Sequence, residues 1–66
     1  MHITVNDDSR SVATGMTVAE LLAALELNPR HVAVEINGVL VPRERHAAHA
    51  LADGDQLEVV TLVGGG

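Results

Sequence analysis

The feature that most limits how this 66-residue chain can fold is a single amphipathic helix pattern between segments that alternate like strands. Thr17 and Glu20 have the spacing of a capping box, in which each side chain hydrogen-bonds a backbone N–H that the first helical turn leaves free. Apolar residues then recur three and four positions apart, which predicts one buried helical stripe: Val18, Leu21, Leu22 and Leu25. Pro29 excludes the α conformation at Asn28, so we expect the helix to end before it.

The residues before the helix have the pattern of a small hairpin. Ile3 and Val5 alternate with polar neighbours, which predicts a short, half-buried strand. Asp7-Asp8-Ser9 predicts a turn, and residues 11–13 predict a second, weak strand that returns beside the first.

A second hairpin is predicted after the helix. Val32, Val34 and Ile36 alternate with less apolar neighbours, as in a strand with one buried face. Asn37-Gly38 is a preferred dipeptide of the two-residue type I′ turn, in which both central residues need a positive φ. Residues 39–41 should therefore return antiparallel to the preceding strand.

The rest of the chain predicts one more strand. Pro42 should end the second hairpin, and residues 43–52 have no regular pattern. Asp53-Gly54 predicts a turn, and residues 56–63 predict the last strand. The order strand, strand, helix, strand, strand, strand indicates an α+β domain in which one helix covers one face of a small sheet.

The composition excludes several classes of function. The chain has no Cys, so it has no disulfide, no Cys-ligated zinc and no thiol nucleophile. It has only four basic Lys or Arg residues and no aromatic residue to stack on bases, which argues against nucleic-acid binding. The apolar runs are too short to cross a membrane and the first residues lack a secretion-signal pattern, so we expect a cytoplasmic location.

Four His residues raise the question of a metal site. His46 and His49 are spaced as neighbours on one helical face, with Glu44 close by, but they match no metal-binding motif. We interpret both as exposed surface residues and expect no metal site. No other group of side chains has the pattern of a catalytic cluster, so we expect no catalytic residue in this chain.

Several short sequence motifs are each common in proteins, but the order in which they follow one another along this chain is informative. They are the Asn37-Gly38 hairpin, the Val41-Pro42-Arg43-Glu44 run, the Asp53-Gly54-Asp55 turn and the terminal Gly65-Gly66. Together with the order of the elements, they resemble the ThiS family, the small ubiquitin-like sulfur carriers of thiazole (thiamin) biosynthesis. The resemblance covers the whole chain. Many relatives have an aromatic residue shortly after the Val-Pro-Arg run, where this chain has His46.

The resemblance implies a ubiquitin-like, β-grasp fold. That fold is a mixed sheet of four to five strands with one helix packed on one face and with the last strand parallel to the first. It would place the folded domain at residues 1–63 and a flexible glycine tail at residues 64–66.

The C-terminal tail is where the resemblance places the chemistry. Three extended glycines span about 10 Å, and without a Cβ they can enter a narrow channel. Gly64 and Gly65 would thread the active site of a partner enzyme. A ubiquitin-activating-type adenylyltransferase, using ATP and Mg²⁺, would adenylate the carboxylate of Gly66. A sulfurtransferase or cysteine desulfurase would supply the sulfur that makes a thiocarboxylate, and thiazole synthase would receive it.

On this interpretation the protein is a carrier that binds no cofactor itself. Its docking surface is predicted on the last strand, where Leu57 and Val59 would face the helix. Val60, Leu62 and Val63 would then form an exposed apolar patch beside the tail. Arg43, in the family-like run, could help to dock an acidic partner surface.

Two alternatives remain at this point. The first is the small subunit of a molybdopterin synthase, which uses the same tail chemistry. The second is a β-grasp interaction module or protein modifier without sulfur chemistry. The chain has no Lys on which it could polymerise, since all four of its basic residues are Arg, and this argues against a polymeric modifier.

Overall fold

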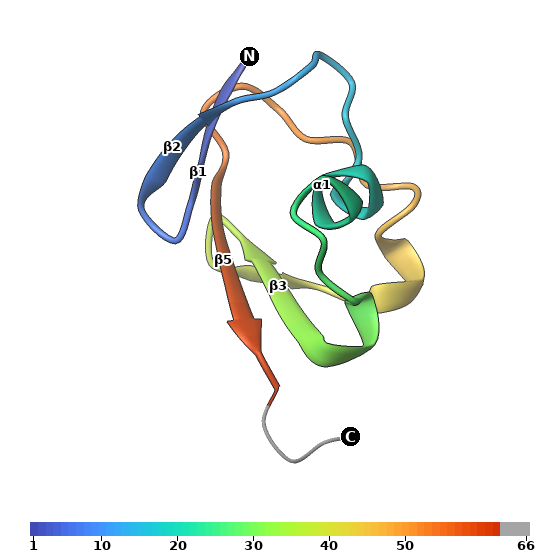
Figure 1. The fold of residues 1–66 in the computed structure, drawn as a ribbon. Coiled ribbons are helices and arrows are strands. Elements are labelled where there is room, and N and C mark those ends of the chain that lie inside the picture. The colour runs from blue at the N-terminus through green and yellow to red at the C-terminus, as the bar shows by residue number, and fades with distance from the viewer. Residues whose placement is uncertain (63–66) are drawn as a thin grey trace.

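The computed structural model describes residues 1–62 as a five-stranded sheet with one α-helix on one face (Figure 1). The strands lie in the order β2-β1-β5-β3-β4. The elements are β1 (His2–Val5), β2 (Asp8–Ser11), α1 (Val18–Ala24), β3 (Val32–Ile36), β4 (Val39–Val41) and β5 (Gln56–Thr61), with 3-10 helices at Pro29–His31 and Arg43–Arg45. The predicted α+β fold is confirmed. The predicted boundary between domain and tail lies outside the described residues.

The first hairpin is tighter than the sequence predicted. Its turn is Asn6-Asp7, with φ of 50° and 69°, and not Asp7-Asp8-Ser9. Val5 pairs directly with Asp8, so the second strand covers Asp8–Ser11 and not residues 11–13. Both turn residues have short polar side chains that tolerate the left-handed conformation, which a two-residue loop requires.

Helix α1 begins as predicted. The Thr17 hydroxyl accepts the Glu20 N–H at 3.2 Å, and a Glu20 carboxylate oxygen accepts the Thr17 N–H at 2.9 Å. The loop after β4 completes the cap, because the carbonyls of His46 and His49 accept the N–H groups of Ala19 and Val18. The helix therefore begins against a segment far along the chain.

The helix ends at Ala24, several residues before Pro29. Glu26 has a φ of 58°, its N–H donates to the carbonyl of Ala23, and the Leu27 N–H donates to the carbonyl of Leu22. This pair of bonds around a left-handed residue is a Schellman motif. The expectation that the helix stops before Pro29 is correct, but the Schellman motif is what ends it.

The second hairpin agrees with the prediction. Asn37 and Gly38 have φ of 52° and 83°, as a type I′ turn requires. β4 returns antiparallel to β3, which also pairs antiparallel with β5. β5 lies between β3 and a parallel β1, and it ends at Thr61 rather than at residue 63.

The core lies between the sheet and α1. Its largest fully buried side chains are Ile3, Leu21, Leu22, Leu57, Val18 and Val34. His46 is also buried, with 4% of its surface exposed, so its interpretation as an exposed residue was wrong. Its Nε2 lies 3.1 Å from the carbonyl oxygen of Val41. Because a carbonyl only accepts, Nε2 is the donor of this bond, and Nδ1 is buried with no hydrogen-bond partner among residues 1–62.

Candidate functional site

The strand that leads to the C-terminus is β5, in the middle of the sheet. Leu57 is buried and Val59 half-buried towards α1, whereas the exposed Glu58 and Val60 point to the open face of the sheet. Val60 is 56% exposed and Leu62, just after the strand, is 48% exposed. The predicted facing of Leu57 and Val59 towards the helix is confirmed, and the role of Val60 and Leu62 in partner binding stays a prediction. Val63, Gly64, Gly65 and Gly66, the rest of the predicted site, lie outside the described residues.

The open face has a further exposed apolar residue that was not predicted from the sequence. Leu40 on β4 is 59% exposed and is paired with Glu35 of β3. Glu35 is paired in turn with Glu58 of β5, so these three side chains form one row across the open face. The alternation of β4 against β3 could have predicted the position of Leu40.

Arg43 is not on the same face as Val60. It begins the 3-10 helix after β4 and is exposed. With Ala19, Pro29 and Ala47 it lines a groove of about 320 Å³ beside α1. The structure therefore places Arg43 on the helix side of the molecule and Val60 on the opposite side of the sheet.

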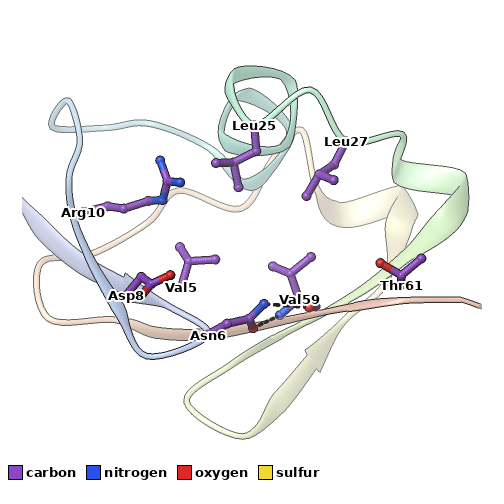
Figure 2. Close-up of a pocket in the computed structure, with 8 residues that line it drawn as sticks. All are labelled: Val5, Asn6, Asp8, Arg10, Leu25, Leu27, Val59 and Thr61. Atoms are coloured by element: carbon purple, nitrogen blue, oxygen red, sulfur yellow. Dashed lines mark hydrogen bonds between the residues drawn. The ribbon is translucent and has the colours of Figure 1, made fainter.

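Two asparagines in the turns fix the position of β5. The Asn6 carboxamide accepts the Val59 N–H at 2.8 Å and donates to the Val59 carbonyl at 3.0 Å (Figure 2). Asn37 accepts the N–H of Gln56 through its side chain at 3.0 Å and donates its own N–H to the Gln56 carbonyl. Each asparagine side chain thus bonds β5 at a point where the neighbouring strand has ended. Neither role was predicted from the sequence.

Beside Asn6 lies a groove of about 300 Å³ between the sheet and the end of α1 (Figure 2). Its apolar wall is formed by Leu25 and Leu27 on one side and by Val5 and Val59 on the other. Asp8, Arg10 and Thr61 complete its lining.

Within residues 1–62, no group of three His, Asp or Glu side chains is placed to hold a metal ion. In the same part of the chain, no helix is long and apolar enough to span a membrane.

A mixed sheet with a parallel pair of terminal strands at its centre, and with one helix across one face, defines the ubiquitin-like, β-grasp class. The sequence profile of the ThiS family matches residues 3–66, and the chain belongs to that family. The crystal structure of ThiS from Geobacter metallireducens superimposes with a TM-score of 0.86 at 39% identity, covering all of both chains.

Two curated relatives show how this domain occurs. The sulfur carrier protein ThiS of Escherichia coli is 41% identical over 66 residues, which is the whole of both chains. A thiazole synthase of Paramagnetospirillum magneticum is 42% identical over the whole of this chain, which spans only 20% of that protein. The domain therefore resembles both a separate small protein and part of a larger one.

Proposed function

We propose that this chain carries sulfur as a thiocarboxylate on Gly66. As a member of the ThiS family it is a sulfur carrier of thiamin biosynthesis, and the observation that carries this conclusion is the full-length match to a sulfur carrier protein. The proposal adds the chemistry of the tail and the enzymes that act on it.

The chemistry must activate the Gly66 carboxylate before sulfur can replace oxygen. With a typical pKa of about 3.5, a terminal carboxylate is ionised at neutral pH and is a poor electrophile. Attack of a carboxylate oxygen on the α-phosphorus of ATP gives an acyl-adenylate and releases pyrophosphate. The terminal sulfur of a persulfide on the sulfur donor then attacks the carbonyl carbon, and AMP leaves with the former carboxylate oxygen. A thiol attacks the donor-side sulfur of the resulting acyl disulfide, which leaves a disulfide on the donor and releases the thiocarboxylate on Gly66.

The catalytic groups for these steps belong to the partners. A ubiquitin-activating-type adenylyltransferase would bind ATP and Mg²⁺, and a sulfurtransferase or cysteine desulfurase would deliver the sulfur. The likeness to part of two thiazole synthases, 42% and 39% identical, supports thiazole synthase as the enzyme that accepts it. We place these reactions in the cytoplasm, where ATP is supplied.

The docking surface that we propose is the open face of the sheet at the end of β5. Val60 and Leu62 are exposed there, and Val63 follows them along the chain. The chain carries a net charge of −5, and Glu35 and Glu58 lie on this face. An apolar partner surface with a basic rim would therefore match it, and opposite charges would speed the encounter. Arg43, on the other side of the molecule, would need a separate contact with the partner.

Alkylation of the thiocarboxylate tests the proposal, because the chain has no Cys that could react with the same reagent. The protein with Gly66 as its C-terminus would be incubated with an adenylating enzyme, ATP and a sulfur donor, and then treated with a thiol alkylating reagent. Fragment mass spectrometry should place the adduct on Gly66 alone. A reaction without ATP is the control.

The absence of an adduct after full incubation would contradict the proposal. Amide conjugates of Gly66 would then indicate a protein modifier. Transfer of sulfur to a pterin precursor, and not to thiazole synthase, would indicate the molybdopterin-type carrier.

A further inference from the structure

Strand β5 changes from an interior strand to an edge strand within its own length. Its parallel pairing with β1 covers Gln56 and Leu57, whereas its pairing with β3 continues to Thr61. β1 leaves the sheet because the chain turns back at Asn6-Asp7. Beyond Val59, the side of β5 that β1 would have covered has no strand beside it within residues 1–62.

The backbone of Thr61 points towards this vacant side. Alternate residues of a strand direct their N–H and C=O groups to the same side. The Val59 groups face the β1 side, where they bond to the Asn6 carboxamide, and the Leu62 N–H faces the β3 side, where it donates to His31. Thr61, two residues after Val59, therefore presents its N–H and its carbonyl next to the end of β1.

The vacant side opens into the groove of Figure 2. The groove has a volume of about 300 Å³, enough for one or two apolar side chains, and its walls are Leu25, Leu27 and Val59. The Arg10 side chain lines the same groove and takes part in no side-chain hydrogen bond formed within residues 1–62. Among residues 1–62, a piece of β5 that has no strand on one side thus lies beside an apolar groove, and it precedes the tail in the sequence.

We propose that the adenylating enzyme adds an extended segment of its own chain alongside Thr61, in the place that β1 vacates. The backbone of this segment would bond the N–H and carbonyl of Thr61, and one apolar side chain would enter the groove. This inference rests on the proposed function, since it names the enzyme that holds the tail as the source of the segment.

The chemistry of the site favours an extended peptide over other occupants. A donor and an acceptor on one strand residue are matched together by another backbone, which also places a side chain in the groove every second residue. A second copy of this chain is disfavoured because each copy carries a net charge of −5. The enzyme that binds the tail is the expected source of this peptide, because the tail begins three residues after Thr61 and the enzyme therefore binds close to this site.

Thr61→Pro tests the proposal, because proline removes the N–H and is tolerated on an edge where that N–H makes no ladder bond. The matched control is Thr61→Val, which keeps the N–H and the strand preference. Both variants should unfold at the same denaturant midpoint as the wild type. Binding to the purified adenylating enzyme, measured by calorimetry, should weaken at least about tenfold for Thr61→Pro and less than about twofold for Thr61→Val.

Amide hydrogen exchange on the wild-type protein gives a second readout. The Thr61 N–H should exchange quickly in the free protein and slowly in the complex, whereas the Leu62 N–H should be protected in both. Equal binding by both variants, a lowered midpoint for Thr61→Pro, or a Thr61 N–H that stays unprotected in the complex would each overturn the inference. If the wild-type protein still gains a thiocarboxylate in the alkylation experiment described above, any of these results overturns this inference alone and leaves the proposed function standing.

Discussion

At the scale of single residues, Leu62 is the side chain that most directly tests the proposed docking surface. Its backbone is held by the bond from its N–H to the His31 carbonyl, and its side chain is 48% exposed. Leu62→Asp should therefore leave the fold intact, since a solvent-exposed side chain adds little to stability. It should weaken binding to the adenylating enzyme at least about tenfold, as expected when an apolar contact is replaced by a charge that must be desolvated.

The matched control is Val39→Asp, measured by the same calorimetric titration. Val39 is 66% exposed, but it lies on edge strand β4 opposite the inward-facing Ile36. The substitution adds the same charge away from Val60 and Leu62. If both variants lose affinity equally, net charge and not the patch determines binding.

His46 is a second informative residue, because it is a buried polar group in a core without aromatic residues. His46→Ala should lower the free energy of unfolding by about 2–4 kcal/mol, because it leaves a cavity and removes the hydrogen bond to the Val41 carbonyl. Chemical denaturation measures this loss. His31→Ala, at an exposed position, should cost less than about 0.5 kcal/mol, and an equal cost for both would contradict the structural role of His46.

At the scale of elements, helix α1 is followed by a residue, Glu26, whose side chain disfavours the left-handed backbone conformation that the residue adopts. Glu26 occupies the left-handed position of the Schellman motif with a φ of 58°. A non-glycine residue there costs roughly 1 kcal/mol. Glu26→Gly should therefore raise the free energy of unfolding by up to about 1 kcal/mol and raise Tm by several degrees for a domain of this size.

Glu26→Ala is the control for this prediction. It removes the same carboxylate but keeps a Cβ at the left-handed position, so it should not stabilise the domain. A gain with both variants would show that the charge of Glu26, and not its backbone conformation, sets the cost.

The elements also show which parts of the fold can be predicted from local signals. The start of α1 and the Asn37-Gly38 turn were predicted correctly, because each depends on residues only a few positions apart. β2 was misplaced because its four residues, Asp8 to Ser11, are all exposed and so carry no apolar alternation. The position of β2 is set by its pairing with β1, and the sequence of β2 alone contains no signal of that pairing.

At the scale of the whole molecule, the order of the elements and the chain length allowed the family to be identified, but distant contacts were not predictable. The burial of His46 depends on the 3-10 helix that turns the chain back under α1, and no periodic pattern marks a single inward residue. Arg43 and Val60 were grouped as docking residues, yet they lie on opposite sides of the molecule. The assignment of Gly66 remains a prediction for the alkylation experiment to test.

The parallel pairing of β1 with β5 also determines how the domain would respond to mechanical force. The N-terminus lies at the end of the sheet where β5 begins, and β5 runs towards the opposite end (Figure 1). Tension between the two ends of the chain would therefore load the bonds of Thr4, Asn6 and Val59 in shear, all together rather than one after another.

A carrier of this kind should resist being pulled apart along its length, although it is small. In a single-molecule stretching experiment, Asn6→Gly should lower the unfolding force, because glycine keeps the positive φ of the turn but loses both bonds to Val59. An unchanged force would mean that the backbone bonds of β1 bear the load alone. The same geometry implies that an enzyme that unfolds the protein by pulling on its C-terminus would meet the strongest resistance at the start of unfolding.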